Sequence, residues 1–64
     1  MVGPAEFEIY EDMAAKLRWR LRAAPGSEPI ASSEAYESKE GCKNGIKSVR
    51  TNAPNATIED LTKG

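Results

Sequence analysis

The stretch that decides the fold is Lys16-Leu17-Arg18-Trp19-Arg20-Leu21-Arg22-Ala23. Apolar residues occupy the odd positions of this run, and cationic residues occupy the even positions. Successive side chains of a β-strand point to opposite faces of the sheet, so strict alternation predicts a half-buried strand. We therefore expect one face of this strand to belong to the core and the other face to carry charge.

Two further strands are predicted on either side of this run. Phe7 and Ile9 alternate with polar residues over residues 6–12, which is the same period of two. After the central strand, Pro29 delays the next strand, because proline has no N–H to donate to a ladder. Residues 30–33 are short and apolar enough to form the third strand.

A helix is predicted to follow, with Ser38 as its N-cap. Its apolar positions recur at spacings of four, three and four, which places them on one stripe: Cys42, Ile46, Val49 and Ala53. Gly41 and Gly45 lie beside that stripe, and each costs a helix roughly 1 kcal/mol relative to alanine. Such a cost suggests that the helix backbone approaches the sheet closely.

Asn52 and Pro54 should end the helix, because the residue before a proline is displaced from the helical region. Residues 57–61 then predict a last short strand with Ile58 as its anchor. The result is an α+β fold, a β-β-β-α-β unit in which one helix packs on a face of an antiparallel sheet. We expect residues 1–64 to form a single domain with an ordered core over about residues 6–61.

Composition narrows the function classes. Nine lysines and arginines against ten acidic residues give a net charge of -1, which argues against attraction of the whole molecule to nucleic acid or anionic lipid. One cysteine and no histidine predict neither a disulfide nor a metal centre, and no cofactor is indicated. No apolar run approaches the roughly 18 residues that span a membrane. The N-terminus lacks the features of a signal peptide, so we expect a cytoplasmic protein.

The predicted core is small for a folded domain. It comprises Phe7, Ile9, Leu17, Trp19, Leu21, Ile30, Cys42, Ile46, Val49 and Ile58. Chains of this length need disulfides, metals, very good packing or a partner chain to become stable. With the first two excluded, packing and oligomerisation remain.

The spacing of several residue groups resembles the YegP-like family. The resemblance rests on residues 7–10, 18–21, 30–39, 42–46 and 49–53, and it covers about residues 6–60. It implies a β-β-β-α-β unit that occurs either as tandem repeats or as one repeat paired with another copy. Two such units would share a sheet and exchange their C-terminal strands. A chain with a single repeat is then expected to be a homodimer, and the family implies no catalytic residues.

The row of cations on the central strand is the first candidate site. With Tyr10 or Tyr36 nearby, it could hold a phosphate backbone while an aromatic ring stacks on a base. The alternative is an ordinary polar face, in which Glu6 and Glu8 on the neighbouring strand form ion pairs with the cations.

Two other groups have the same ambiguity. Hydroxyls and charges gather over residues 32–39, where only Lys39 or a carboxylate could serve as a base, whereas capping and turn chemistry also explains them. Cys42 lies near lysines at the start of the helix but also on its apolar stripe, so it is either a reactive thiol or a packing residue.

The sequence therefore predicts an interaction or structural module that forms a homodimer and has no enzymatic activity. The alternative function is weak binding of nucleic acid. The candidate binding residues are Arg18, Arg20, Arg22, Tyr36, Ser38 and Lys39.

Overall fold

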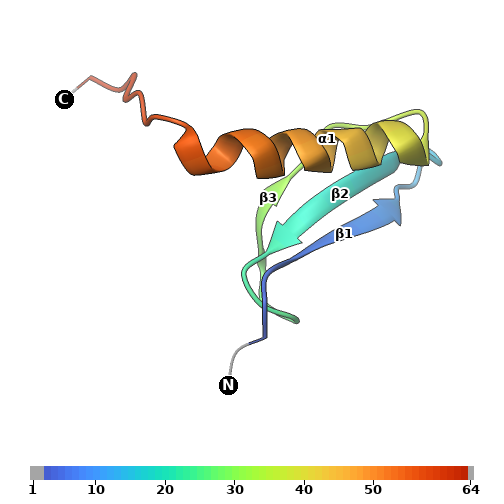
Figure 1. The fold of residues 1–64 in the computed structure, drawn as a ribbon. Coiled ribbons are helices and arrows are strands. Elements are labelled where there is room, and N and C mark those ends of the chain that lie inside the picture. The colour runs from blue at the N-terminus through green and yellow to red at the C-terminus, as the bar shows by residue number, and fades with distance from the viewer. Residues whose placement is uncertain (1–2, 64) are drawn as a thin grey trace.

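The computed structural model describes residues 3–63 and shows a meander of three strands followed by a helix. The strands are β1 (Glu6–Glu11), β2 (Leu17–Arg22) and β3 (Pro29–Ser32). They pair in the order β1-β2-β3, and both pairings are antiparallel. Helix α1 (Lys39–Asn52) lies across one face of this sheet, and a 3-10 turn (Ala53–Asn55) follows it (Figure 1). The α+β class predicted from the sequence is confirmed.

The register between β1 and β2 places apolar residues opposite apolar residues and charged residues opposite charged residues. Phe7 pairs with Leu21 and Ile9 with Trp19, whereas Glu8 pairs with Arg20. The rings of Phe7 and Trp19 meet edge to face, with centroids 5.3 Å apart. The alternation of β2 therefore separates an apolar face, which contacts α1, from a charged face on the other side of the sheet.

Helix α1 begins and ends where the sequence predicts. Ser38 is the N-cap, and its Oγ accepts a hydrogen bond from the backbone N–H of Gly41 at 3.0 Å. The helix gives way at Asn52 to the turn that contains Pro54. Gly45 lies close to the sheet: a Cβ at this position would collide with the Tyr36 hydroxyl and lie 3.3 Å from the indole nitrogen of Trp19.

The core is smaller than the sequence predicts. Among residues 3–63, only Trp19 and Cys42 are buried. Six of the other predicted core residues are half-buried: Phe7, Ile9, Leu17, Leu21, Ile46 and Val49. The apolar face of the sheet is therefore covered only in part by α1.

Ile30 was predicted to lie in the core, and this prediction was wrong. The strand β3 begins at Pro29, which pairs with Arg22, one residue earlier than expected. The register shifts between Leu21 and Arg22, so Ile30 is an extra residue of a β-bulge and remains 66% exposed. Proline is tolerated here because β3 is an edge strand.

The predicted last strand is not formed within the chain. Residues 57–61 have no regular secondary structure, and this segment runs away from the end of α1 (Figure 1). Ile58, predicted as a core anchor, is 97% exposed, and Leu61 is 83% exposed. A strand needs a neighbour to satisfy its backbone, and no other described segment of this chain lies beside it.

Candidate functional site

The four cations of the central run each form an ion pair. Arg20 and Arg22 both bind Glu8, Arg18 binds Asp12, and Lys16 binds Glu37. The N···O distances lie between 2.6 and 2.8 Å. The predicted cross-strand ion pairs therefore exist, although Glu8 alone, without Glu6, provides both of those on β1.

Glu8 is the centre of the charged face. Its Oε1 accepts hydrogen bonds from Nε of Arg20 at 2.6 Å and from Nε of Arg22 at 2.8 Å. These two hydrogen bonds lower the pKa of Glu8 from 4.5 to about 2. The guanidinium of Arg20 also lies over the Tyr10 ring, 4.5 Å from its centroid. Tyr10, one of the two aromatic residues that could have stacked on a base, is thus already occupied by an arginine.

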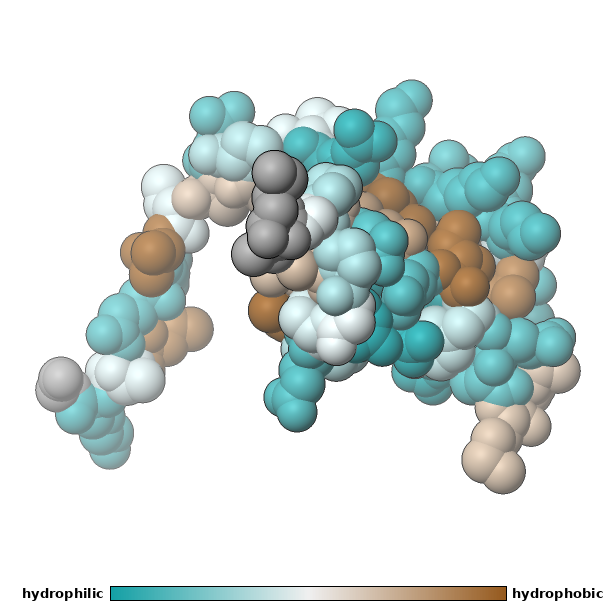
Figure 2. Space-filling view, turned by 90° about the horizontal axis from the view of Figure 1, so that it is seen from below, coloured by the Kyte–Doolittle hydropathy of each residue, from teal (hydrophilic) through white to brown (hydrophobic). Residues whose placement is uncertain are grey.

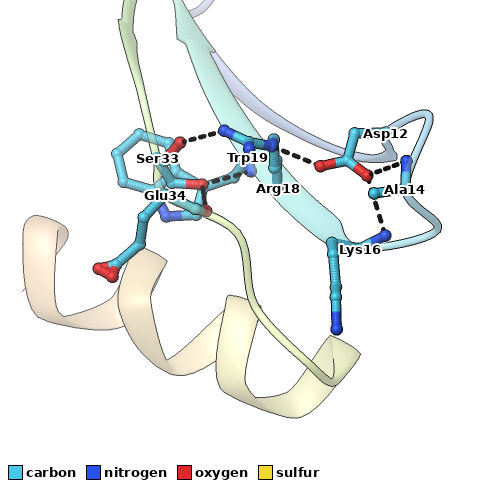
Figure 3. Close-up of polar contacts among 7 residues, drawn as sticks. All are labelled: Asp12, Ala14, Lys16, Arg18, Trp19, Ser33 and Glu34. Atoms are coloured by element: carbon cyan, nitrogen blue, oxygen red, sulfur yellow. Dashed lines mark hydrogen bonds and ion pairs between the residues drawn. The ribbon is translucent and has the colours of Figure 1, made fainter.

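A second polar network connects the β1–β2 turn with the end of β3 (Figure 3). Asp12 Oδ1 accepts the backbone N–H groups of Ala14 and Lys16, and Asp12 Oδ2 accepts Nε of Arg18 at 2.7 Å. Arg18 also donates to the carbonyl of Ser33, whose hydroxyl accepts the N–H of Trp19. These contacts lower the pKa of Asp12 and raise that of Arg18. Arg18 therefore connects the β1–β2 turn with the residue that follows β3.

The remaining candidate residues lie in a different place. Tyr36 forms a single β-bridge with Leu17, and its ring packs beside Gly41 and Gly45. The Oγ of Ser38 is engaged as the helix cap. Lys39 is exposed at the first position of α1. The six residues predicted as a binding site are therefore divided between the charged sheet face and the start of the helix.

Sequence reasoning selected Lys39 but overlooked that it forms a row with the other cations of α1. Lys39, Lys43, Lys47 and Arg50 are all exposed. Within residues 3–63 none of them forms an ion pair or a side-chain hydrogen bond, in contrast to the cations of β2. Their spacing of four, four and three residues was the signal in the sequence, because such positions share one side of a helix.

Cys42 has the environment of a packing residue. Its relative exposure is 0%, and this burial raises the pKa of its thiol. A buried thiol with a raised pKa is poorly ionised and poorly accessible to a reagent. These observations favour the packing interpretation over the reactive one.

The described part of the chain offers little in the way of a chemical centre. Across residues 3–63 there is no pocket, and there is no group of three or more histidine, cysteine or acidic residues placed to hold a metal ion. No helix among these residues has the length and apolar character needed to cross a bilayer.

Exposed apolar side chains lie in three parts of the chain. The large ones are Met13 in the β1–β2 turn, Ile30 on β3, and Ile58 and Leu61 in the C-terminal segment. Figure 2 shows the C-terminal segment standing away from the body with hydrophobic atoms exposed along it. It also shows hydrophobic atoms on the body among hydrophilic ones. Contiguous apolar patches often mark a contact with another protein, whereas single exposed apolar side chains are common on protein surfaces.

Comparison with known proteins gives consistent matches. The family model described as "Domain of unknown function (DUF1508)" matches residues 12–60. A UPF0339 protein of Treponema denticola is 55% identical over 56 residues, which cover 88% of this chain and 95% of that protein. A UPF0339 protein of Stutzerimonas stutzeri is 52% identical over 48 residues, which cover 75% of this chain but only 42% of that protein.

A solved structure agrees with the fold. The NMR solution structure of a protein from Haloferax volcanii superposes with a TM-score of 0.81 at 40% sequence identity, covering 92% of this chain and 98% of that one. The match of the family model over most of the chain and the identity to a relative of nearly the same length decide the assignment. The chain belongs to the DUF1508 (UPF0339) family of small domains of unknown function, which confirms its resemblance to YegP-like proteins.

Proposed function

We propose that this chain is a self-association module, a homodimer in which residues 57–61 of each copy add a strand to the sheet of the other. The observation that carries this proposal is the state of the C-terminal segment. Ile58 and Leu61 are almost fully exposed, whereas the apolar face of the sheet is only half-buried. One copy therefore displays the apolar side chains that the other copy lacks.

Energetics support this arrangement. Burying a large aliphatic side chain stabilises a protein by about 1.5–3 kcal/mol, so covering Ile58 in both copies would contribute two such increments. Strand addition would also satisfy the backbone groups of residues 57–61 and cover a free edge of the sheet. Both gains address the weakness of a core in which two residues are buried.

The comparisons support pairing of two units. The Stutzerimonas stutzeri relative has more than twice the length of the region that matches this chain, since the match covers 42% of it. That protein has room for a second unit of the same size. A single-unit chain would reach the same pairing by association with another copy.

In this proposal the molecule acts by binding and is not an enzyme. The candidate nucleophiles have structural roles: Cys42 is buried in the core, and the Ser38 hydroxyl caps the helix. The arginines of β2 are no stronger a case for nucleic-acid binding, because each of them already forms an ion pair with a carboxylate. We place the module in the cytoplasm, where reducing conditions preserve a free thiol such as that of Cys42.

Molar mass measured by size exclusion with light scattering tests the proposal. We expect a mass of twice 7.0 kDa at micromolar concentration. Ile58→Asp should abolish the dimer, because a buried carboxylate would be unpaired. Thr57→Asp is the matched control: neighbouring strand residues point to opposite faces, so it adds the same charge on the other side. A wild-type mass of 7.0 kDa at all concentrations would refute the dimer.

Removal of the segment tests the exchange itself. A chain ending before Ala56 lacks the exchanged strand, so dimerisation and cooperative folding should be lost together. A truncated chain that is still folded and dimeric would show that the copies associate through another surface.

A further inference from the structure

Charge is distributed unevenly between α1 and the rest of the chain. The helix holds four of the nine basic residues but one of the ten acidic residues, Glu40, which gives it a net charge of +3. The remaining residues then carry a net charge of -4. The overall charge of -1 therefore conceals a strongly basic helix.

The basic residues of α1 form one continuous stripe. With 3.6 residues per turn, Lys39, Lys43, Lys47 and Arg50 project within a narrow sector of the helix surface. At a rise of 1.5 Å per residue the stripe is about 16 Å long. All four side chains are exposed and, within residues 3–63, none has a carboxylate partner.

The cations of α1 are more available to an external anion than those of β2. An anion that approached the sheet would have to displace Glu8 from two arginines or Asp12 from Arg18. An anion that approached α1 would meet only hydrated cations. The attraction available for an external polyanion is therefore on the helix.

The other side of α1 restricts the kind of anion. Cys42 is fully buried, and Gly45 lies against Tyr36 and Trp19, so the apolar stripe of the helix already packs on the sheet. A helix that lies on a membrane needs a free apolar face to insert into the lipid. The exposed neighbours of the cations are instead Asn44, Ser48 and Thr51, which can hydrogen-bond to phosphates and sugars.

We propose that α1 binds the phosphate backbone of a single-stranded nucleic acid through Lys39, Lys43, Lys47 and Arg50. Lysine provides a mobile point charge, which suits contacts with phosphates that do not depend on base sequence. The stripe lies on one chain, so the site does not require the dimer. Binding through this helix replaces the sheet arginines as the nucleic-acid site.

Fluorescence anisotropy of a labelled oligothymidylate of about 20 nucleotides tests the proposal. At physiological salt we expect a Kd between roughly 10⁻⁶ and 10⁻⁴ M, and tighter binding at about 50 mM. Four phosphate contacts to a single strand predict a loss of affinity of about 50-fold when the salt is raised to about 200 mM. Amide shifts in the NMR spectrum should cluster in α1 and not on β2. The absence of any anisotropy change at low salt would overturn the proposal, as would shifts confined to Arg18, Arg20 and Arg22.

Matched variants separate a site from overall charge. K39Q/K43Q/K47Q removes three positive charges from the stripe and should abolish binding, with the circular dichroism of the fold unchanged. A5E/A14E/A35E lowers the net charge by the same amount at exposed positions outside α1, and it should retain most of the affinity. Glu40→Gln should tighten binding. Equal loss in the two triple variants, or binding to phosphatidylserine vesicles but not to the oligonucleotide, would contradict the proposed site.

Discussion

The two faces of β2 are built from alternate residues of one strand, yet they are stabilised in different ways. The apolar face consists of Leu17, Trp19 and Leu21, and it depends on fit against α1. The charged face consists of Arg18, Arg20 and Arg22, and it depends on pairs with carboxylates. Close packing is lost when the shape of a buried side chain changes, whereas partly exposed ion pairs contribute only modestly to the free energy of unfolding. Changes on the apolar face should therefore have the larger effects.

Trp19→Ala should have the largest effect on the apolar face. Trp19 is 6% exposed and packs on Phe7 and Gly45, so truncation leaves a cavity at the centre of the fold. Such substitutions cost about 3–5 kcal/mol, which should leave a domain of this size unfolded by circular dichroism and NMR.

Trp19→Phe is the control for this cavity. The buried indole N–H has no hydrogen-bond partner among residues 3–63, so phenylalanine removes an unsatisfied donor together with part of the packing. We expect this variant to fold, with lower stability than the wild type. A folded and cooperative Trp19→Ala variant would show that the apolar face does not determine the fold.

Gly45→Ala sharpens the comparison by adding a single methyl group. That group would collide with the Tyr36 hydroxyl, and overpacking of this kind costs about 1–3 kcal/mol, partly offset by the better helix propensity of alanine. Gly41→Ala is the matched substitution, since its nearest neighbour would be the Ser38 Oγ at 3.3 Å. Denaturant unfolding should show clear destabilisation for Gly45→Ala and a smaller change for Gly41→Ala. Equal effects would mean that helix propensity alone governs both sites.

Local pattern was sufficient to predict most of the fold. The alternation of apolar and charged residues located β1 and β2, and the cap at Ser38 located the start of α1. The bulge at Ile30 was not predictable in this way, because it arises from the register between two strands. The last strand was predicted wrongly for a related reason: a strand exists only with a neighbour, and residues 57–61 have none in the described part of the chain.

The candidate site was less predictable than the fold. The row on β2 and an ion pair through Glu8 followed from the pattern, because cross-strand neighbours share a face. The pair between Arg18 and Asp12 did not, since it depends on a turn in which Ala15 adopts a left-handed φ of 62°. The spacing of the α1 cations places them on one side of the helix, but their lack of carboxylate partners among residues 3–63 could be recognised only in the structure.

Glu8→Gln should be the most damaging single change on the charged face, because it removes the carboxylate shared by Arg20 and Arg22. We expect a lower denaturant midpoint than in the wild type, by less than for Gly45→Ala, because the group is partly exposed. Glu6→Gln is the matched control, since Glu6 lies on the same strand and pairs in register with Arg22 but forms no ion pair among the described residues. Equal effects would indicate that net charge, not pairing, stabilises this face.

Lowering the pH should reduce the difference in unfolding free energy between Glu8→Gln and the wild type. Folding lowers the pKa of Glu8 from 4.5 to about 2, so its ion pairs stabilise the folded state fully above pH 4.5 and lose that contribution as the pH falls toward 2. Asp12 titrates in both proteins, so its contribution cancels in the difference between them. The gap in unfolding free energy, measured by denaturant titration at several pH values, should be constant from pH 7 to 5 and then shrink. A gap that persists unchanged at pH 2 would show that the carboxylate stabilises β2 through packing, and the two faces of the strand would then be alike.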